Sequence, residues 1–139
     1  MAGTVIADTL QGSVSGTPPQ FNDGSGTQIG TLCRAWVNFN GLSGASPVIR
    51  ASFNVSSVTR NATGYYTINF TNALSDANYS VAGGFAASYG TRGVGGLTLF
   101  TNPTGVAEVA PTTSAFVVWT ADIASNTIDS KYVNLSVYR

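Results

Sequence analysis

The residue types that carry most enzyme chemistry are scarce in this chain. Its 139 residues include no histidine, one cysteine and six carboxylates. Histidine is the usual general base and the commonest metal ligand, and a Ser–His or Cys–His catalytic pair is impossible without it. Cys33 falls on an expected core face, where a lone cysteine behaves as a small hydrophobic residue. We therefore predict a protein that is not an enzyme and that holds no metal and no cofactor.

Two carboxylates, Asp122 and Asp129, flank the loop ADIASNTID. If they met across this loop they could hold calcium together with carbonyl oxygens, or stand as the carboxylate pair of a glycosidase. Aspartate in a hairpin loop more often stabilises the turn itself. The glycine-rich stretch GGFAASYGTRGVGG lies between expected strands and opens no helix, so it is not a phosphate-binding loop.

The stretch CRAWVNFNG has two different faces when it is read with a period of two. Cys33, Ala35, Val37 and Phe39 form an ordinary core face, whereas Arg34, Trp36, Asn38 and Asn40 fall on the opposite side. A tryptophan there can bury a large amphipathic area against a neighbouring copy. The alternative is that the two sheets and long loops of one chain cover this face. We predict a subunit interface formed by Arg34, Trp36, Trp119, Tyr132 and Tyr138.

Charge is unusually low. Charged residues make up 9% of the chain and the formal net charge is zero, which leaves no electrostatic footprint for nucleic acid or anionic lipid. No apolar run approaches the length of a membrane span. A neutral surface is poorly defended against association. These features predict a homo-oligomer that binds neither nucleic acid nor the membrane interior.

From Ile29 onward, short alternating segments follow one another and none carries a sustained helical period. Turn residues separate them about every ten residues, which is typical of a sandwich or barrel. We predict an all-β, antiparallel sandwich of about seven or eight strands, jelly-roll-like or immunoglobulin-like, over residues 29–139. The expected strands are Thr31–Asn40, Val48–Phe53, Tyr65–Phe70, Tyr79–Ala87, Gly95–Thr101, Ser114–Ala121 and Tyr132–Arg139.

Residues 1–28 differ from the rest, because Gly, Ser, Pro, Asn and Asp dominate after a short apolar stretch. Such residues supply loops and do not build a core. The opening residues lack the basic and long apolar regions of a signal peptide, so we expect folding in a cytoplasm. This segment is either a frayed terminus or an arm that attaches to another protein through Thr4, Val5, Ile6 and Leu10.

The loop SYGTRGV offers a planar ring and a forked donor, Tyr89 and Arg92, on a glycine scaffold. Both residue types are favoured in interfaces, so the loop is a weak candidate for receptor binding. The competing interpretation is an ordinary surface hairpin tip.

Several motifs resemble the C-terminal β-domain of bacteriophage tail fibres and related virion appendages, particularly those of cyanophages. They are Ala35–Gly41 (AWVNFNG), Ile49–Thr59 (IRASFNVSSVT), Gly64–Phe70 (GYYTINF), Asp76–Tyr79 (DANY) and Tyr132–Val137 (YVNLSV). The resemblance covers residues 29–139 and is dense in 33–81 and 130–139. It implies a β-rich module on an oligomeric, often trimeric, virion fibre.

The expected function is that of a short tail fibre or a tail or neck appendage in a virion assembled in the host cytoplasm. Residues 1–28 would anchor the chain to other virion proteins, and the β-domain would contact a host surface glycan or protein. Two alternatives stay open: a capsid decoration protein, and a free carbohydrate-binding module. Long fibres carry a lengthy shaft, whereas only about 28 residues precede the module here.

Overall fold

The computed structural model describes Thr9, Pro19 and residues 21–44, 46–86, 96–100, 107–122 and 124–139. The chain divides into two compact units, Met1–Leu32 and Cys33–Arg139. The first unit contains a small hairpin, in which β1 (Phe21–Asn22) pairs antiparallel with β2 (Gln28–Gly30). Asp23 closes the turn, because its Oδ1 accepts hydrogen bonds from the backbone N–H groups of Ser25 and Thr27 at 2.9 and 2.8 Å.

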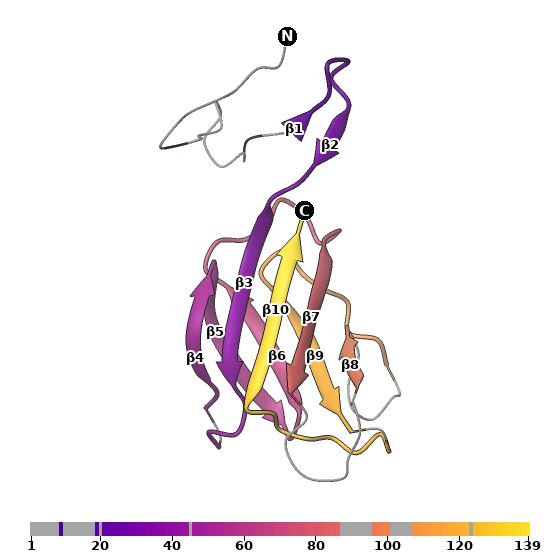
Figure 1. The fold of residues 1–139 in the computed structure, drawn as a ribbon. Coiled ribbons are helices and arrows are strands. Elements are labelled where there is room, and N and C mark those ends of the chain that lie inside the picture. Colours follow the sequence, from indigo (N-terminus) through magenta and orange to yellow (C-terminus); the bar gives the residue numbers. More distant parts are fainter. Residues whose placement is uncertain are drawn as a thin grey trace. The chain divides into compact units, whose positions relative to one another are not determined.

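The second unit is an all-β sandwich, as the strand pattern predicts (Figure 1). Two four-stranded antiparallel sheets form its layers. The front sheet has the order β4-β3-β10-β7 and the back sheet β5-β6-β9-β8. The strands are β3 (Cys33–Asn40), β4 (Val48–Phe53), β5 (Val55–Ala62), β6 (Tyr65–Phe70), β7 (Ser80–Ala86), β8 (Gly96–Leu99), β9 (Ala115–Ala121) and β10 (Tyr132–Tyr138).

The final strand, β10, lies in the interior of the front sheet. It pairs with β3 on one side and with β7 on the other. The sandwich therefore depends on a strand that ends one residue before the C-terminus. Its alternation is regular: Val133, Leu135 and Val137 are buried, and the residues between them point outward.

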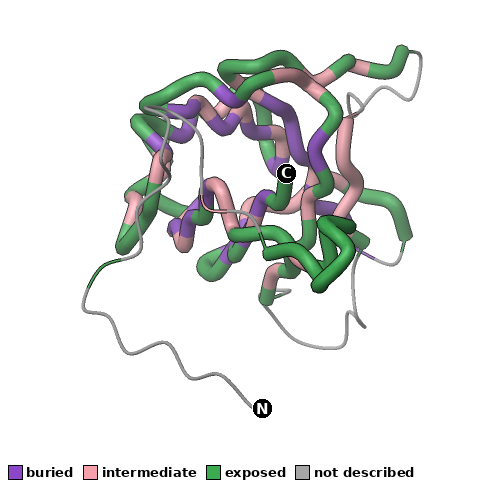
Figure 2. The backbone as a smooth tube through the Cα atoms, turned by 90° about the horizontal axis from the view of Figure 1, so that it is seen from above, coloured by how far each residue is buried: buried purple, intermediate pink, exposed green. Residues whose placement is uncertain are grey.

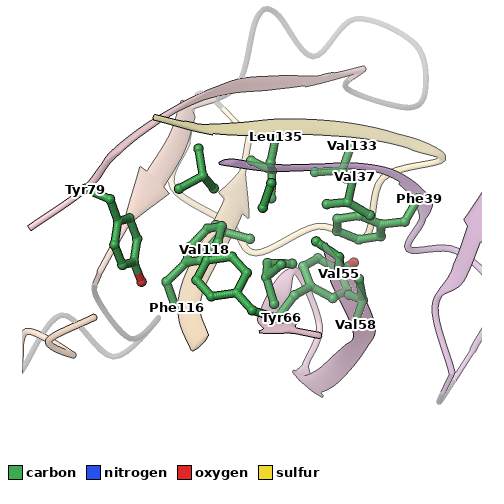
Figure 3. Close-up of a cluster of buried hydrophobic side chains, with 14 of the residues drawn as sticks. Val37, Phe39, Val55, Val58, Tyr66, Tyr79, Phe116, Val118, Val133 and Leu135 are labelled. Atoms are coloured by element: carbon green, nitrogen blue, oxygen red, sulfur yellow. The ribbon is translucent and has the colours of Figure 1, made fainter. Parts of the chain in front are cut away.

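The core consists of the inward-facing residues of both sheets, which alternate with exposed or half-buried ones along the strands (Figure 2). Val37, Phe39, Val133 and Leu135 of the front sheet point toward Tyr66, Phe116 and Val118 of the back sheet (Figure 3). The Phe39 and Tyr66 rings meet edge to face, with centroids 5.1 Å apart. Aromatic pairs prefer this geometry, because the positive ring edge meets the negative ring face.

One strand of the sandwich is missing from the sequence prediction. Strand β5 was not expected, because its Ser, Thr and Asn content reads as a loop although Val55 and Val58 are buried. The segment TNALSDAN is irregular, and Leu74 within it is buried. The backbone of β10 lies close to Gly83, where an added Cβ would collide with the Asn134 carbonyl.

Among the described residues, no helix has the length and apolar character that a membrane span needs.

Candidate binding surface

The exposed aromatic residues of the sandwich gather on one side. We call the outward side of the front sheet the front face. Its large apolar side chains are Trp36 (39% exposed), Val48 (53%), Phe53 (55%), Tyr132 (45%) and Tyr138 (38%). Scattered exposed apolar residues are normal on a protein surface, but several on the outward side of one sheet make that side a candidate docking surface.

The strand register arranges these side chains in rows across the front sheet. Phe53, Trp36 and Ser136 stand opposite one another on β4, β3 and β10. The next outward row contains Ala51, Asn38, Asn134 and Gly84. Tyr132 stands opposite Ala86 at one end of β10, and Tyr138 stands opposite Ser80 at the other. One amide row therefore separates Trp36 from Tyr132 on the front face.

The amide row is internally connected. The Asn38 Nδ2 group donates to Asn134 Oδ1, and Arg50 Nη1 donates to Asn38 Oδ1 at 3.1 Å. In this series of two hydrogen bonds, Asn134 takes part only as an acceptor, through Oδ1. The Nδ2 group of the exposed Asn134 can therefore donate to a ligand or to water. The row ends at Gly84, where an added Cβ would meet nothing within 4 Å. Asn134 thus borders open space.

Two cations surround Tyr132. The Arg50 guanidinium lies 4.5 Å from the centre of its ring, and the Lys131 ammonium lies 5.7 Å from the same centre. Arg50 Nη2 also donates to the Lys131 carbonyl at 2.6 Å. These contacts fix the guanidinium across β3 and hold it over the front face.

The charges of the sandwich are unevenly distributed. Arg60 pairs with Asp129, and Arg139 pairs with Asp76. Arg34, Arg50 and Lys131 have no carboxylate partner among the described residues. The four strands of the front sheet contain no Asp or Glu. The front face therefore combines aromatic rings with unpaired positive charge.

The outer side of the back sheet, the back face, carries amide and hydroxyl groups that satisfy one another, together with the half-buried Tyr65 and Trp119. Asn69 Nδ2 donates to Ser57 Oγ and Thr59 Oγ1 at 3.0 and 3.3 Å. Asn61 Nδ2 donates to Thr67 Oγ1 at 2.8 Å. Hydroxyl and amide groups that satisfy one another across strands leave little to offer a partner.

The structure brings together four of the five residues predicted for a subunit interface. Trp36, Tyr132 and Tyr138 share the front face, and the half-buried Arg34 falls in the register shift between Val137 and Tyr138 on the same sheet. Trp119 belongs to the back sheet, between Tyr65 and Thr98, and its Nε1 has no hydrogen-bond partner within the described ranges. One flat contact cannot include all five residues.

The carboxylates singled out in the sequence have structural roles. Asp122 is buried and its Oδ1 accepts the N–H groups of Ala124 and Asn126, both at 2.9 Å, which is the expected turn chemistry. Asp129 binds Arg60 instead. Among the described residues, no three His, Cys, Asp or Glu side chains gather in a way that could hold a metal ion.

Asp129 is the centre of a network that closes one end of the sandwich. It accepts hydrogen bonds from Arg60, from the Gly64 N–H at 2.8 Å and from the Tyr66 hydroxyl at 2.6 Å. Burial opposes its charge, but these hydrogen bonds outweigh burial and hold the pKa of Asp129 below its ordinary value. Burial and the same contact raise the pKa of Tyr66 well above its ordinary value. The network is a clasp between β5, β6 and the segment before β10.

A separate hollow of about 580 Å³ is lined by Leu99, Phe100, Glu108, Val109, Ala110 and Pro111. Of the described residues that line it, Glu108 carries a charge and the others are apolar. We assign it no binding role.

Two predicted sites lie outside the described residues. They are the receptor-binding candidates Tyr89 and Arg92, and the attachment residues Thr4, Val5, Ile6 and Leu10.

Sequence reasoning missed the contribution of β4 to the front face. A strict period of two places Phe53 on the same side as Ile49, which packs against the core. The register shift between Asn38 and Phe39 instead puts Val48 and Phe53 opposite outward residues of β3. A bulge adds one residue to a strand and reverses its alternation. Nothing in the letters VIRASF marks that position.

No family model matches the chain, and no curated protein matches it. One solved structure does: the phiAB6 tailspike, solved in complex with three-repeated oligosaccharides of Acinetobacter baumannii surface polysaccharide. It is 13% identical, with a TM-score of 0.47 over 96% of this chain. The match spans 30% of the tailspike chain, so the present chain is similar to a fraction of that protein.

Proposed function

We propose that this chain is a structural protein of a bacteriophage virion, a short tail fibre or a tail or neck appendage, whose β-sandwich contacts the host surface. The motif resemblance over residues 29–139 supports the virion assignment. The observation that carries the contact role is the front face, because exposed Trp36, Phe53, Tyr132 and Tyr138 lie together on one flat sheet.

The role is binding without catalysis. A chain without histidine, in which Asp129 is tied to Arg60 and Asp122 to its own turn, offers no prepared acid–base pair in the described residues. The first unit, Met1–Leu32, is the candidate anchor to other virion proteins. Oligomerisation, with three copies suggested by the resemblance, belongs to the same proposal.

Immunogold labelling of purified phage particles with an antibody against this chain tests the proposal. We expect gold at the tail or neck. Label spread over the capsid would favour the decoration alternative. Particles that carry no label would favour a free carbohydrate-binding module and contradict the proposal.

One observation also favours a second use of the front face. Trp36, Tyr132 and Tyr138 are what a subunit interface exposes when its partner is removed, and the chain has little charge to oppose association. Light scattering of the isolated chain, with Trp36→Ala as the variant, tests that use: an oligomer that dissociates in the variant would support it.

A further inference from the structure

The charges of the front face indicate the class of partner. Arg50 and Lys131 flank the Tyr132 ring, and Arg34 lies at the opposite end of the sheet. The strands beneath them contribute no carboxylate. Complementarity across an interface then requires negative charge on the partner.

The spacing of the rings indicates an extended partner. Tyr132 and Tyr138 are six residues apart on one strand, which corresponds to about 20 Å. The Trp36 row lies between them, and the amide row separates Trp36 from Tyr132. Aromatic faces suit the apolar C–H faces of sugar rings, and amides and hydroxyls suit sugar hydroxyls. This alternation matches an oligosaccharide better than a compact ligand.

The front face of a second copy is a poor partner for this face. If two front faces met, the cations of both copies would enter one interface, and the front strands would supply no carboxylate to pair with them. Burying unpaired like charges is costly and acts against such a contact.

We propose that the front face binds an acidic polysaccharide, one that carries carboxylate groups on its sugar rings. This inference rests on the proposed host-surface role and names its ligand class. Trp36, Tyr132 and Tyr138 stack against sugar rings. Asn134 donates to hydroxyl groups beside Gly84, and Arg50 and Lys131 pair with carboxylates next to Tyr132.

Calorimetric titration of the full chain tests the proposal with three acidic polysaccharide fragments: alginate, polygalacturonate and hyaluronate. We expect at least one to bind and to weaken as sodium chloride is added, because salt screens exposed charge pairs. Dextran, a neutral sugar polymer, and polyglutamate, an acidic polymer without sugar, serve as comparison ligands and should bind far more weakly.

Single substitutions show whether the front sheet or another part of the sandwich binds the polysaccharide. Trp36→Ala and Tyr132→Ala should each reduce affinity by about tenfold, and Arg50→Ala should also reduce the salt dependence. Tyr65→Ala on the back sheet and Arg139→Ala, which removes a cation outside the front strands, should leave affinity unchanged. Thermal melts check that each variant is folded. We expect all of them to fold, because Trp36, Tyr132 and Arg50 are exposed.

Several results would overturn the inference: failure of all three acidic fragments to bind, equal binding of dextran or polyglutamate, or loss of binding in Tyr65→Ala to the same extent as in Trp36→Ala. Failure of the inference is distinct from failure of the proposed function. Gold label at the tail with no glycan binding contradicts only the ligand class. Glycan binding with unlabelled particles contradicts only the virion role.

Discussion

The two outer faces of the sandwich differ in how far their side chains find partners within the chain. Both cover a sheet whose inner side is core. On the back face, Asn61 and Asn69 donate to neighbouring hydroxyl groups, so the polar atoms satisfy one another. On the front face, rings stay exposed, and Arg50 and Lys131 have no carboxylate partner among the described residues. The hydrogen-bonded amide and hydroxyl groups of the back face support stability, whereas the exposed rings and cations of the front face are available to a partner.

The largest expected effect comes from removing the strand that the front face and the core share. Deleting residues 132–139 removes β10, the interior strand between β3 and β7. Both neighbours lose their hydrogen-bond partners, and Val133, Leu135 and Val137 leave the core. The loss should exceed the total stability of an ordinary domain, about 5–15 kcal/mol. Circular dichroism should show an unfolded chain; a cooperative melt in the truncated protein would contradict the assigned topology.

The second-largest loss of stability is expected when the Asp129 clasp is broken. Asp129→Asn leaves Arg60 without its ion pair and weakens the bond to Tyr66, so we expect a loss of about 2–3 kcal/mol in the free energy of unfolding. Asp76→Asn breaks the exposed pair with Arg139 and should cost less than about 1 kcal/mol. Urea denaturation compares them, and equal losses would show that Asp129 is no clasp.

The same clasp predicts an acid-sensitive stability. The pKa of Asp129 is held below its ordinary value, so its contribution is fully present above the unfolded-state pKa of about 3.9. It is lost as the pH falls through the lower folded-state pKa. Melting temperatures measured as the pH is lowered from roughly 6 to 2 should fall on the acid side. A fall of the same size in Asp129→Asn would assign the effect to other carboxylates.

The smallest losses of stability are expected for single substitutions on the two outer faces. Trp36→Ala removes a side chain that is 39% exposed, and the cost should be well below the 3–5 kcal/mol, roughly, of a buried Trp→Ala change. Asn69→Ala on the back face removes two cross-strand hydrogen bonds and should cost about 1 kcal/mol. Affinity for the acidic polysaccharide should fall in Trp36→Ala and stay unchanged in Asn69→Ala. A variant pair in which stability and binding fall together would remove the distinction between the faces.

Much of the sandwich could be predicted from sequence alone. In β6 and β10, and in β3 from Ala35 onward, the period of two is regular, so the inward and outward residues follow directly from the letters. At the start of β3 the register shift at Arg34 interrupts this alternation. In β5 the outward positions are Ser and Thr, and the strand is recognisable only through the buried Val55 and Val58 once β6 is beside it. Local composition cannot report a tertiary pairing.

The front face was only partly predictable. Trp36, Tyr132 and Tyr138 follow from alternation, but whether Trp119 joins them depends on which sheet receives β9. Arg50 reaches Tyr132 by crossing β3, a contact between residues 82 positions apart that strand order alone creates. Which positive charges form ion pairs could not be predicted either, because the sequence shows only that positive and negative charges are equal in number.

The two tryptophans provide the most direct test, because Trp36 lies on the front sheet and Trp119 on the back sheet. In ¹⁵N-labelled protein each indole N–H gives its own resonance, so one spectrum follows both sheets while an acidic polysaccharide fragment is added. The account predicts that the Trp36 signal shifts in a saturable way and that the Trp119 signal stays in place. A shift at Trp119 with a stationary Trp36 would contradict the assignment of the front face as the binding surface.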